Sequence, residues 1–264
     1  MASGIDKGSF GGIALAVGGI LVGLTLEGGR VAQLLQPTAA LIVFGGTLGA
    51  VLLQYPLPTV LTAFASLRKV FFEHTDDPVA AVTEMVGYAQ KARKEGIVSL
   101  DAQLESIREP FLKKSLMLAV DGTEPAELRS IMELELDNRA EREERVAKVF
   151  ESAGGFSPTI GIIGAVLGLI QVMQHLDNIG EVGRGIAVAF VATIYGVGIA
   201  NLFLLPSAGK IKLRQRDEQL RREIVLEGVI SILEGMNPRM LETKLLSFIE
   251  ESHKKTRDTE KVMA

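Results

Sequence analysis

The sequence predicts an all-α integral membrane protein, with four transmembrane helices and a helical cytoplasmic domain inserted between spans two and three. Four stretches contain no Asp, Glu, Lys or Arg, namely residues 8–26, 31–67, 152–176 and 185–209. A bilayer core of about 30 Å takes about 20 apolar residues in a helix, so each stretch can hold one span. The charges gather in residues 68–151 and in the C-terminal tail, and such dense charge belongs in water.

The distribution of charge also predicts the domain boundaries and the orientation. We expect a transmembrane hairpin over residues 1–67, a cytoplasmic helical domain over 68–151, a second transmembrane hairpin over 152–209 and a cytoplasmic helical tail over 210–264. All but two of the 28 Lys and Arg lie at the N-terminus, in the inserted domain or in the tail. The exceptions, Arg30 and Arg184, fall in the short connections. Because basic residues concentrate on the cytoplasmic side, both termini and the inserted domain should face the cytoplasm.

Small residues and prolines mark the spans themselves. Pro37 is expected to begin span two, and Pro56 with Pro58 should end or bend the same helix. Glycines at a spacing of four let helix backbones approach closely in lipid. We expect such packing at two pairs, Gly45 with Gly49 and Gly164 with Gly168.

The inserted domain and the tail have helical patterns throughout. A first helix should begin at Pro78, with Asp77 as its N-cap, and end at Gly96. A later, longer helix capped by Thr123 should lead into the third span, and the tail helix should break near Pro238. No segment shows the alternating pattern of a strand, so we expect every element to be helical.

No span holds a carboxylate, although a protein that moves ions through a membrane usually needs a titratable or anionic group there. Either the chain conducts nothing, or another chain supplies the carboxylate. His175 lies at the outer end of span three, where it is poorly placed for a proton relay. The chain has no cysteine, and no nucleophile–base set, metal cluster or phosphate loop is evident, so we do not expect an enzyme or a cofactor.

Spans three and four carry a few polar and helix-breaking residues. A hydroxyl such as that of Thr193 often bonds only the preceding helical turn. Pro158 and Pro206 lie at the cytoplasmic ends of spans three and four, and each removes one backbone hydrogen bond. Such a position can be a hinge, or simply the end of a helix.

Three segments resemble a known family. They are Pro158-Thr-Ile-Gly-Ile-Ile-Gly-Ala-Val-Leu-Gly-Leu-Ile, residues 187–206 ending in Asn-Leu-Phe-Leu-Leu-Pro, and residues 92–101 reading Ala-Arg-Lys-Glu-Gly-Ile-Val-Ser-Leu-Asp. They are similar to the MotA/PomA family, the A subunits of the bacterial flagellar motor stator, within the MotA/TolQ/ExbB superfamily. The order of two spans, insert, two spans and tail agrees with that family across nearly the whole chain.

The resemblance implies an inner-membrane protein that forms a ring around a MotB/PomB-like single-span subunit, whose membrane aspartate binds the permeating ion. Pro158 and Pro206 match the family's two functional prolines, which couple ion passage to movement of the cytoplasmic domain. Arg93 matches an arginine that faces the rotor switch protein FliG. Asp101 stands where the family usually has glutamate, which keeps the charge but shortens its reach. No nucleic-acid partner is implied.

The resemblance also bears on the transported ion. Sodium must exchange its water for oxygen ligands, and sodium-type relatives carry a threonine in each of the last two spans. Thr193 matches one of them, but Ala165 stands at the place of the other and Ala192 replaces a neighbouring threonine. We therefore expect proton rather than sodium coupling. The rival interpretations are an ExbB/TolQ-like energiser ring that powers another envelope process, and a plain four-helix scaffold; the fourth span favours the stator.

Overall fold

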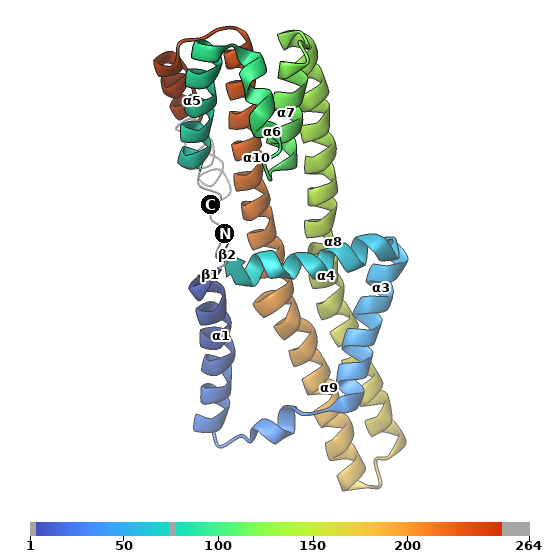
Figure 1. Ribbon diagram of the computed structural model, residues 1–264. Coiled ribbons are helices and arrows are strands. Elements are labelled where there is room, and N and C mark those ends of the chain that lie inside the picture. Colours follow the sequence, from blue (N-terminus) through green and yellow to red (C-terminus); the bar gives the residue numbers. More distant parts are fainter. Residues whose placement is uncertain (1–3, 74–77, 250–264) are drawn as a thin grey trace. The chain divides into compact units, whose positions relative to one another are not determined.

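The structure is a computed structural model that describes residues 4–73 and 78–249, and these residues are almost entirely helical (Figure 1). The elements in chain order are β1 (Gly4–Ile5), α1 (Lys7–Leu26), the 3₁₀ helix η1 (Val31–Leu34), α2 (Pro37–Ala40), the π-helix η2 (Leu41–Gly45), α3 (Gly46–Gln54), α4 (Leu57–Phe71), β2 (Phe72–Glu73), α5 (Pro78–Glu95), the 3₁₀ helix η3 (Ile97–Leu100), α6 (Asp101–Leu104), α7 (Pro110–Val120), α8 (Pro125–Gln174), α9 (Ile179–Ile199), the π-helix η4 (Ala200–Leu204) and α10 (Leu205–Leu233). A further helix covers residues 238–249. The all-α fold class is confirmed.

The chain forms two compact units. Unit 1 comprises residues 1–74 and 143–213, and unit 2 comprises residues 75–142 and 214–264. The long helices α8 and α10 each contribute one part to each unit. Both units are therefore built from segments that lie far apart in the sequence.

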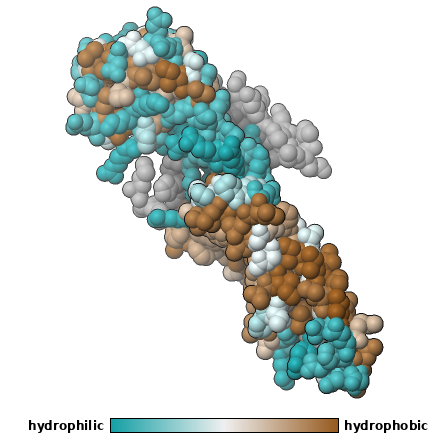
Figure 2. All heavy atoms as spheres, turned by 90° about the vertical axis from the view of Figure 1, so that its right-hand side faces the viewer, coloured by the Kyte–Doolittle hydropathy of each residue, from teal (hydrophilic) through white to brown (hydrophobic). Residues whose placement is uncertain are grey.

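Four helical segments are long and apolar enough to cross a membrane: Lys7–Leu26, Pro37–Gln54, part of Pro125–Gln174 and part of Ile179–Leu233. The second span runs through α2, η2 and α3, and it begins at Pro37 as the sequence predicts. Its helix ends at Gln54, and Pro56 becomes the N-cap of the separate helix α4. The predicted break at Pro56 is therefore confirmed. On the face seen in Figure 2, hydrophobic side chains cover most of the membrane-spanning part of unit 1, and hydrophilic side chains gather at its far end.

Most predicted helix boundaries of the inserted domain are also found. Helix α5 begins at Pro78 and is followed by Gly96, whose φ of 84° is a conformation that glycine adopts without strain. The predicted N-cap Asp77 lies outside the described residues. Thr123 is not the cap of α8, because α8 begins one residue later than expected, at Pro125, which favours the first position of a helix. The break near Pro238 is confirmed.

The expectation that every element is helical is wrong at one place. The two-residue strands β1 and β2 pair antiparallel, with Gly4 opposite Glu73 and Ile5 opposite Phe72. The amide of Asp6 also donates to the carbonyl of Phe71 at 3.0 Å. Two-residue strands are too short to show a periodic pattern, so only the contact between distant segments reveals them.

Unit 2 has a continuous apolar core. It is built by α5, η3, α6, α7, the first part of α8, the second part of α10 and residues 238–249. Its largest fully buried side chains include Met85, Phe111, Leu116, Leu128, Met132, Ile230 and Leu241. Gly228 of α10 faces Met85 so closely that an added Cβ would lie 2.7 Å from its Cγ. The core therefore needs both the inserted domain and the tail.

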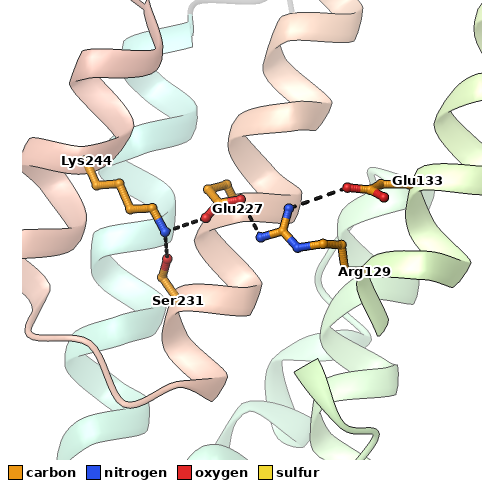
Figure 3. A network of polar contacts seen from close by, with 5 residues as sticks. All are labelled: Arg129, Glu133, Glu227, Ser231 and Lys244. Atoms are coloured by element: carbon orange, nitrogen blue, oxygen red, sulfur yellow. Dashed lines mark hydrogen bonds and ion pairs between the residues drawn. The ribbon is translucent and has the colours of Figure 1, made fainter. Parts of the chain in front are cut away.

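A charged network beside this core joins three helices (Figure 3). Glu227 of α10 accepts a hydrogen bond from Arg129 of α8 at 2.8 Å and is ion-paired with Lys244 of the helix 238–249. Lys244 also donates to Ser231 at 3.1 Å, and Arg129 reaches Glu133 at 3.5 Å. The Glu227 side chain is only 10% exposed. Burial alone would raise its pKa, but the hydrogen bonds and charges of Lys244 and Arg129 outweigh burial and hold the pKa of Glu227 below its usual value.

This network predicts a dependence of the stability of unit 2 on pH. Because the pKa of Glu227 is lower in the folded than in the unfolded protein, its contribution is present above the unfolded pKa and is lost as pH falls through the folded pKa. Glu227→Gln should lower the free energy of unfolding at neutral pH by about 1 to 3 kcal/mol. It should also flatten the decline of stability between neutral and acid pH, measured by thermal unfolding of the purified protein.

The matched control is Glu133→Gln, which removes the other carboxylate bound to Arg129. Glu133 is 55% exposed, so this change should cost no more than about 1 kcal/mol. Equal pH profiles for the parent and Glu227→Gln would contradict the role assigned to the network.

Candidate functional site

The candidate site in unit 1 is the antiparallel pair of helices α8 and α9, which meet along small residues. A Cβ added at Gly161 would lie 2.9 Å from the carbonyl oxygen of Ala192, and one added at Gly168 would lie 2.8 Å from the amide nitrogen of Ala189. A Cβ at Gly196 would lie 2.6 Å from the carbonyl oxygen of Ser157. Real Cβ atoms do not make contacts this short, so the backbones approach as closely as they do only because these positions are glycines.

The prediction of close packing is confirmed for one glycine pair, whereas the other pair makes no close helix contact within this chain. Gly164 and Gly168 both lie in the α8–α9 contact. Gly45 and Gly49 face open space, and the close approach of α3 to α8 is made instead by Gly46, where an added Cβ would lie 2.8 Å from Ile160. Spacing alone identifies a row of small residues, but it does not show which row faces a neighbouring helix.

Ala165 and Thr193 lie at the same depth on one side of this helix pair. Ala165 directly follows Gly164, and Thr193 directly follows Ala192. Gly164 and Ala192 are in contact, since a Cβ added at Gly164 would lie 2.7 Å from the Cβ of Ala192. Because the two helices are antiparallel, one step beyond the contact turns both side chains toward the same side. Thr193 is half-buried, and its hydroxyl donates to the carbonyl of Ala189 at 3.2 Å.

The rest of that side is apolar and exposed within the single chain. The large residues on it are Ile162, Leu169, Phe190 and Val197, which are between 46% and 69% exposed. Pro158 belongs to the same side, since it lies seven residues before Ala165, or about two helical turns. We call this surface, made of these residues with Pro158, Ala165 and Thr193, the open face.

The second span covers the opposite side of the pair, with α2 and η2 against α9 and Gly46 of α3 against Ile160 of α8. The hydroxyl of Tyr195 in α9 donates to the carbonyl of Leu34 and accepts from the amide of Gln36 at 3.3 Å. Its ring stacks on Phe44 with the centroids 5.8 Å apart. Tyr195 thus binds the connection between spans one and two where η1 ends at Leu34 and the chain turns into α2, and it satisfies backbone groups that have no helical partner there.

The helical segments that carry the two prolines predicted as functional pack against each other in unit 1. Pro158 stands inside the unbroken helix α8, while Pro206 is the second residue of α10, and α10 directly follows the π-helix η4. Gly154, one turn before Pro158, packs against Leu205, and an added Cβ there would lie 2.6 Å from Leu205 Cδ2. Both positions therefore combine a missing backbone donor with contact between helices.

A buried ion pair beside Pro206 was not predicted from the sequence. Asp6 is 5% exposed, and its Oδ2 lies 2.5 Å from the Nζ of Lys210, one turn after Pro206. Lys210 also donates to Ser9 at 2.7 Å, and Ser9 donates to the carbonyl of Val70 at 2.8 Å. This cluster ties the start of α1 to α4 and α10. Asp6 also caps α1, and an aspartate directly before an apolar helix was a signal that the sequence offered.

Arg93 and Asp101 lie on the surface of unit 2. Arg93 is in the last turn of α5, and Asp101 begins α6 after the turn at Gly96 and the 3₁₀ helix η3. Both side chains are exposed, and within the described ranges neither forms an ion pair. Val98 between them is 68% exposed, whereas Leu100 is fully buried and anchors the segment. The structure thus presents two unpaired charges of opposite sign on either side of an exposed apolar residue.

Taken together, these features describe a polytopic membrane protein in which one face of the α8–α9 pair is uncovered and the charge-free stretches of both helices, residues 152–176 and 185–209, hold no carboxylate. Residues 103–224 match the sequence model of the MotA/TolQ/ExbB proton channel family, and residues 10–96 match the model of the Motility protein A N-terminal region. Motility protein A of Bacillus subtilis is 37% identical over 93% of this chain and 91% of its own length.

Solved structures are similar as well. One chain of the solved flagellar MotAB stator complex from Bacillus subtilis is 36% identical in sequence to this chain. The two structures match with a TM-score of 0.86, and the match covers 95% of this chain and 99% of that chain. The corresponding chain of C. jejuni MotAB is 31% identical, with a TM-score of 0.87 over 92% of this chain and 95% of that chain. This chain belongs to the MotA/PomA family of the MotA/TolQ/ExbB proton channel superfamily.

The glycine contact predicts a position-specific sensitivity to one added methyl group. Gly196→Ala would force the added methyl group against the carbonyl oxygen of Ser157, and it should destabilise the α8–α9 pair by about 1 to 3 kcal/mol. Gly198→Ala is the control, because Gly198 lies in the same helix and faces open space. Thermal unfolding in detergent should separate the two variants, and equal midpoints would contradict the close packing.

Proposed function

We propose that this chain is the A subunit of a flagellar motor stator, and that it converts ion flow into torque together with a single-span, MotB/PomB-like partner. The open face is the observation that carries the proposal. It is apolar, it is uncovered within the chain, and none of the four spans holds a carboxylate. A helix of a partner subunit that brings one carboxylate would complete an ion site there, and several copies of this chain would surround it as a ring.

The ion path then runs along the open face past Thr193 and Ala165. Thr193 supplies the one hydroxyl on this face, and that hydroxyl already donates to Ala189. Ala165 offers no side-chain oxygen at the same depth. A proton needs only a titratable carboxylate and water, whereas sodium needs several oxygen ligands, so the arrangement supports proton coupling.

Pro158 and Pro206 are the positions at which ion binding would bend the helices. Each proline lacks the donor of one helical hydrogen bond, and the π-helix before Pro206 already departs from regular geometry. Helices α8 and α10 both continue into unit 2, so a bend at these prolines would be transmitted to the part of the chain that carries Arg93 and Asp101. We place unit 2 and both termini in the cytoplasm, in keeping with the basic residues that flank the spans.

The ExbB/TolQ-like energiser ring remains the alternative to a motor. The match of residues 10–96 to the Motility protein A N-terminal region supports the motor, as does similarity to Motility protein A over nearly the full length of both chains. Residues 103–224 by themselves match the broader family and do not separate the two functions.

The proposal predicts which assembly conducts ions. Vesicles that hold this chain with its single-span partner should pass protons along a pH gradient, and vesicles that hold this chain alone should stay at background. A sodium gradient without a pH gradient should produce no flux, because the path lacks the second hydroxyl. Full proton flux through this chain by itself would overturn the proposed division of labour, and swimming that stops when sodium is withdrawn at constant proton-motive force would overturn proton coupling.

The exposed pair Arg93 and Asp101 predicts a contact with the rotor switch protein FliG. Each exposed ion pair contributes only about 0 to 1 kcal/mol, which suits contacts that form and break repeatedly. Arg93→Glu should reduce swimming speed without reducing co-purification of the stator complex, and Arg93→Glu with Asp101→Lys should nearly abolish swimming. Lys113→Glu, a reversal at another exposed site of unit 2, is the control and should swim normally. Normal swimming of the double variant would exclude this surface as the rotor contact.

A further inference from the structure

A cavity of about 490 Å³ lies where the second span meets helices α8 and α9, and its volume is within the range of small-ligand sites. Its apolar walls come from Ile42 of η2, Leu167 and Ile170 of α8, and Val188 of α9. Leu167 and Ile170 are 44% and 46% exposed, so the cavity opens to the surroundings of the spans, which in a membrane are lipid chains. It shares no residue with the open face, so the ion path proposed above leaves it unused.

The polar side chains of the cavity come from the ends of the same spans. Thr38 lies at the start of α2, Gln171 is in the last turn of α8, and His175 directly follows that helix. Glu181 and Arg184 lie in the first two turns of α9. These groups therefore gather at one membrane boundary, while the apolar walls continue into the spans. A phospholipid has the same arrangement, with a polar headgroup at the boundary and apolar chains inside.

The charges at this boundary have both signs. Nη1 of Arg184 donates to Oε1 of Glu181 at 3.0 Å and to Oε2 at 3.4 Å. Among the described residues these bonds use only Nη1, so Nε and Nη2 of Arg184 still offer donors. The carboxylate of Glu181 is 39% exposed and still offers acceptor sites. The pair has no net charge, so it suits a ligand that carries an anion and a cation together.

His175 adds a hydrogen-bond acceptor to the cavity. Its Nδ1 lies 3.0 Å from the carbonyl oxygen of Gln171, one of the last carbonyls of α8. Because a carbonyl oxygen can only accept, Nδ1 carries the proton, and Nε2 of the neutral ring is an acceptor. A ligand with N–H groups next to a phosphate would thus meet acceptors on His175 and Glu181 and donors on Arg184.

We propose that this cavity binds a phospholipid whose headgroup is a primary amine, of the phosphatidylethanolamine class. An acyl chain fills the part between the apolar walls, and the phosphate accepts hydrogen bonds from Arg184. The ammonium group donates to Glu181 and to Nε2 of His175. The trimethylated nitrogen of phosphatidylcholine cannot do so because it has no N–H, and phosphatidylglycerol brings no positive charge to Glu181. The inference needs only the membrane spans and does not rest on the motor function.

Native mass spectrometry of this chain in complex with its single-span partner tests the headgroup. Phosphatidylethanolamine, its N-methyl and N,N-dimethyl forms, phosphatidylcholine and phosphatidylglycerol, all with the same acyl chains, are added one at a time at equal concentration. Phosphatidylethanolamine should bind about tenfold more tightly than phosphatidylcholine, the factor that one hydrogen bond to a charged group contributes. Affinity should fall stepwise as methyl groups replace the N–H donors, and phosphatidylglycerol should bind no better than phosphatidylcholine.

Two charge variants make the test specific for the cavity. Glu181→Gln with Arg184→Gln leaves the net charge unchanged, and it should bring the affinities for the ethanolamine and choline lipids close together. Glu27→Gln with Arg30→Gln removes the same two charges from the connection between spans one and two, outside the cavity. This control should leave the ratio of the two affinities as in the parent.

A third variant fills the apolar part of the cavity. Ile170→Trp should weaken the binding of every phospholipid, whereas Val166→Trp, at a similarly exposed position of α8 outside the cavity, should not. Equal affinity of the parent for the ethanolamine and choline lipids, or unchanged lipid binding by Ile170→Trp, would overturn the proposal. So would loss of copies of this chain from the complex on Ile170→Trp, because a second copy rather than lipid would then occupy the cavity.

Discussion

The absence of water from hydrocarbon is the constraint on which the rest of unit 1 depends. Every backbone amide and carbonyl in the bilayer needs a partner within the protein. Helices meet that need along the four spans, and Tyr195 meets it between the end of η1 at Leu34 and the start of α2 at Pro37. Where the chain can no longer satisfy it, at Pro56, the helix leaves the span and continues as α4. The need to satisfy backbone hydrogen bonds, more than the burial of side chains, therefore decides the architecture of unit 1.

Lipid also removes the usual driving force for helix association, since the tails are as apolar as the side chains. The α8–α9 pair relies instead on close backbone contact at Gly161, Gly168 and Gly196. This contact buries the side of each helix that carries small residues, and it leaves the larger residues exposed on the open face. The same packing that stabilises the pair therefore creates an apolar surface on which a further helix can lie.

Charged side chains, unlike apolar ones, lie only where an ion-pair partner or water is available. Asp6 is buried but paired with Lys210, and Glu227 is buried between Arg129 and Lys244. In both cases the partners come from distant parts of the chain, so the pairs join elements that sequence order separates. Arg93 and Asp101 differ in having no such partner within the described ranges, which is what makes them suited to a contact with another protein.

The sequence by itself determined the number of spans, their approximate ends and the positions of the main helix breaks, because lipid tolerates no charge and proline and glycine act locally. It also identified the residues of the α8–α9 contact in part, through the spacing of Gly164 and Gly168. Only the tertiary structure decided which glycine row faces a neighbour, that Asp6 pairs with Lys210, and that residues 57–71 form a helix outside the second span. Spacing is a property of one helix, whereas each of these outcomes depends on which distant segment lies opposite.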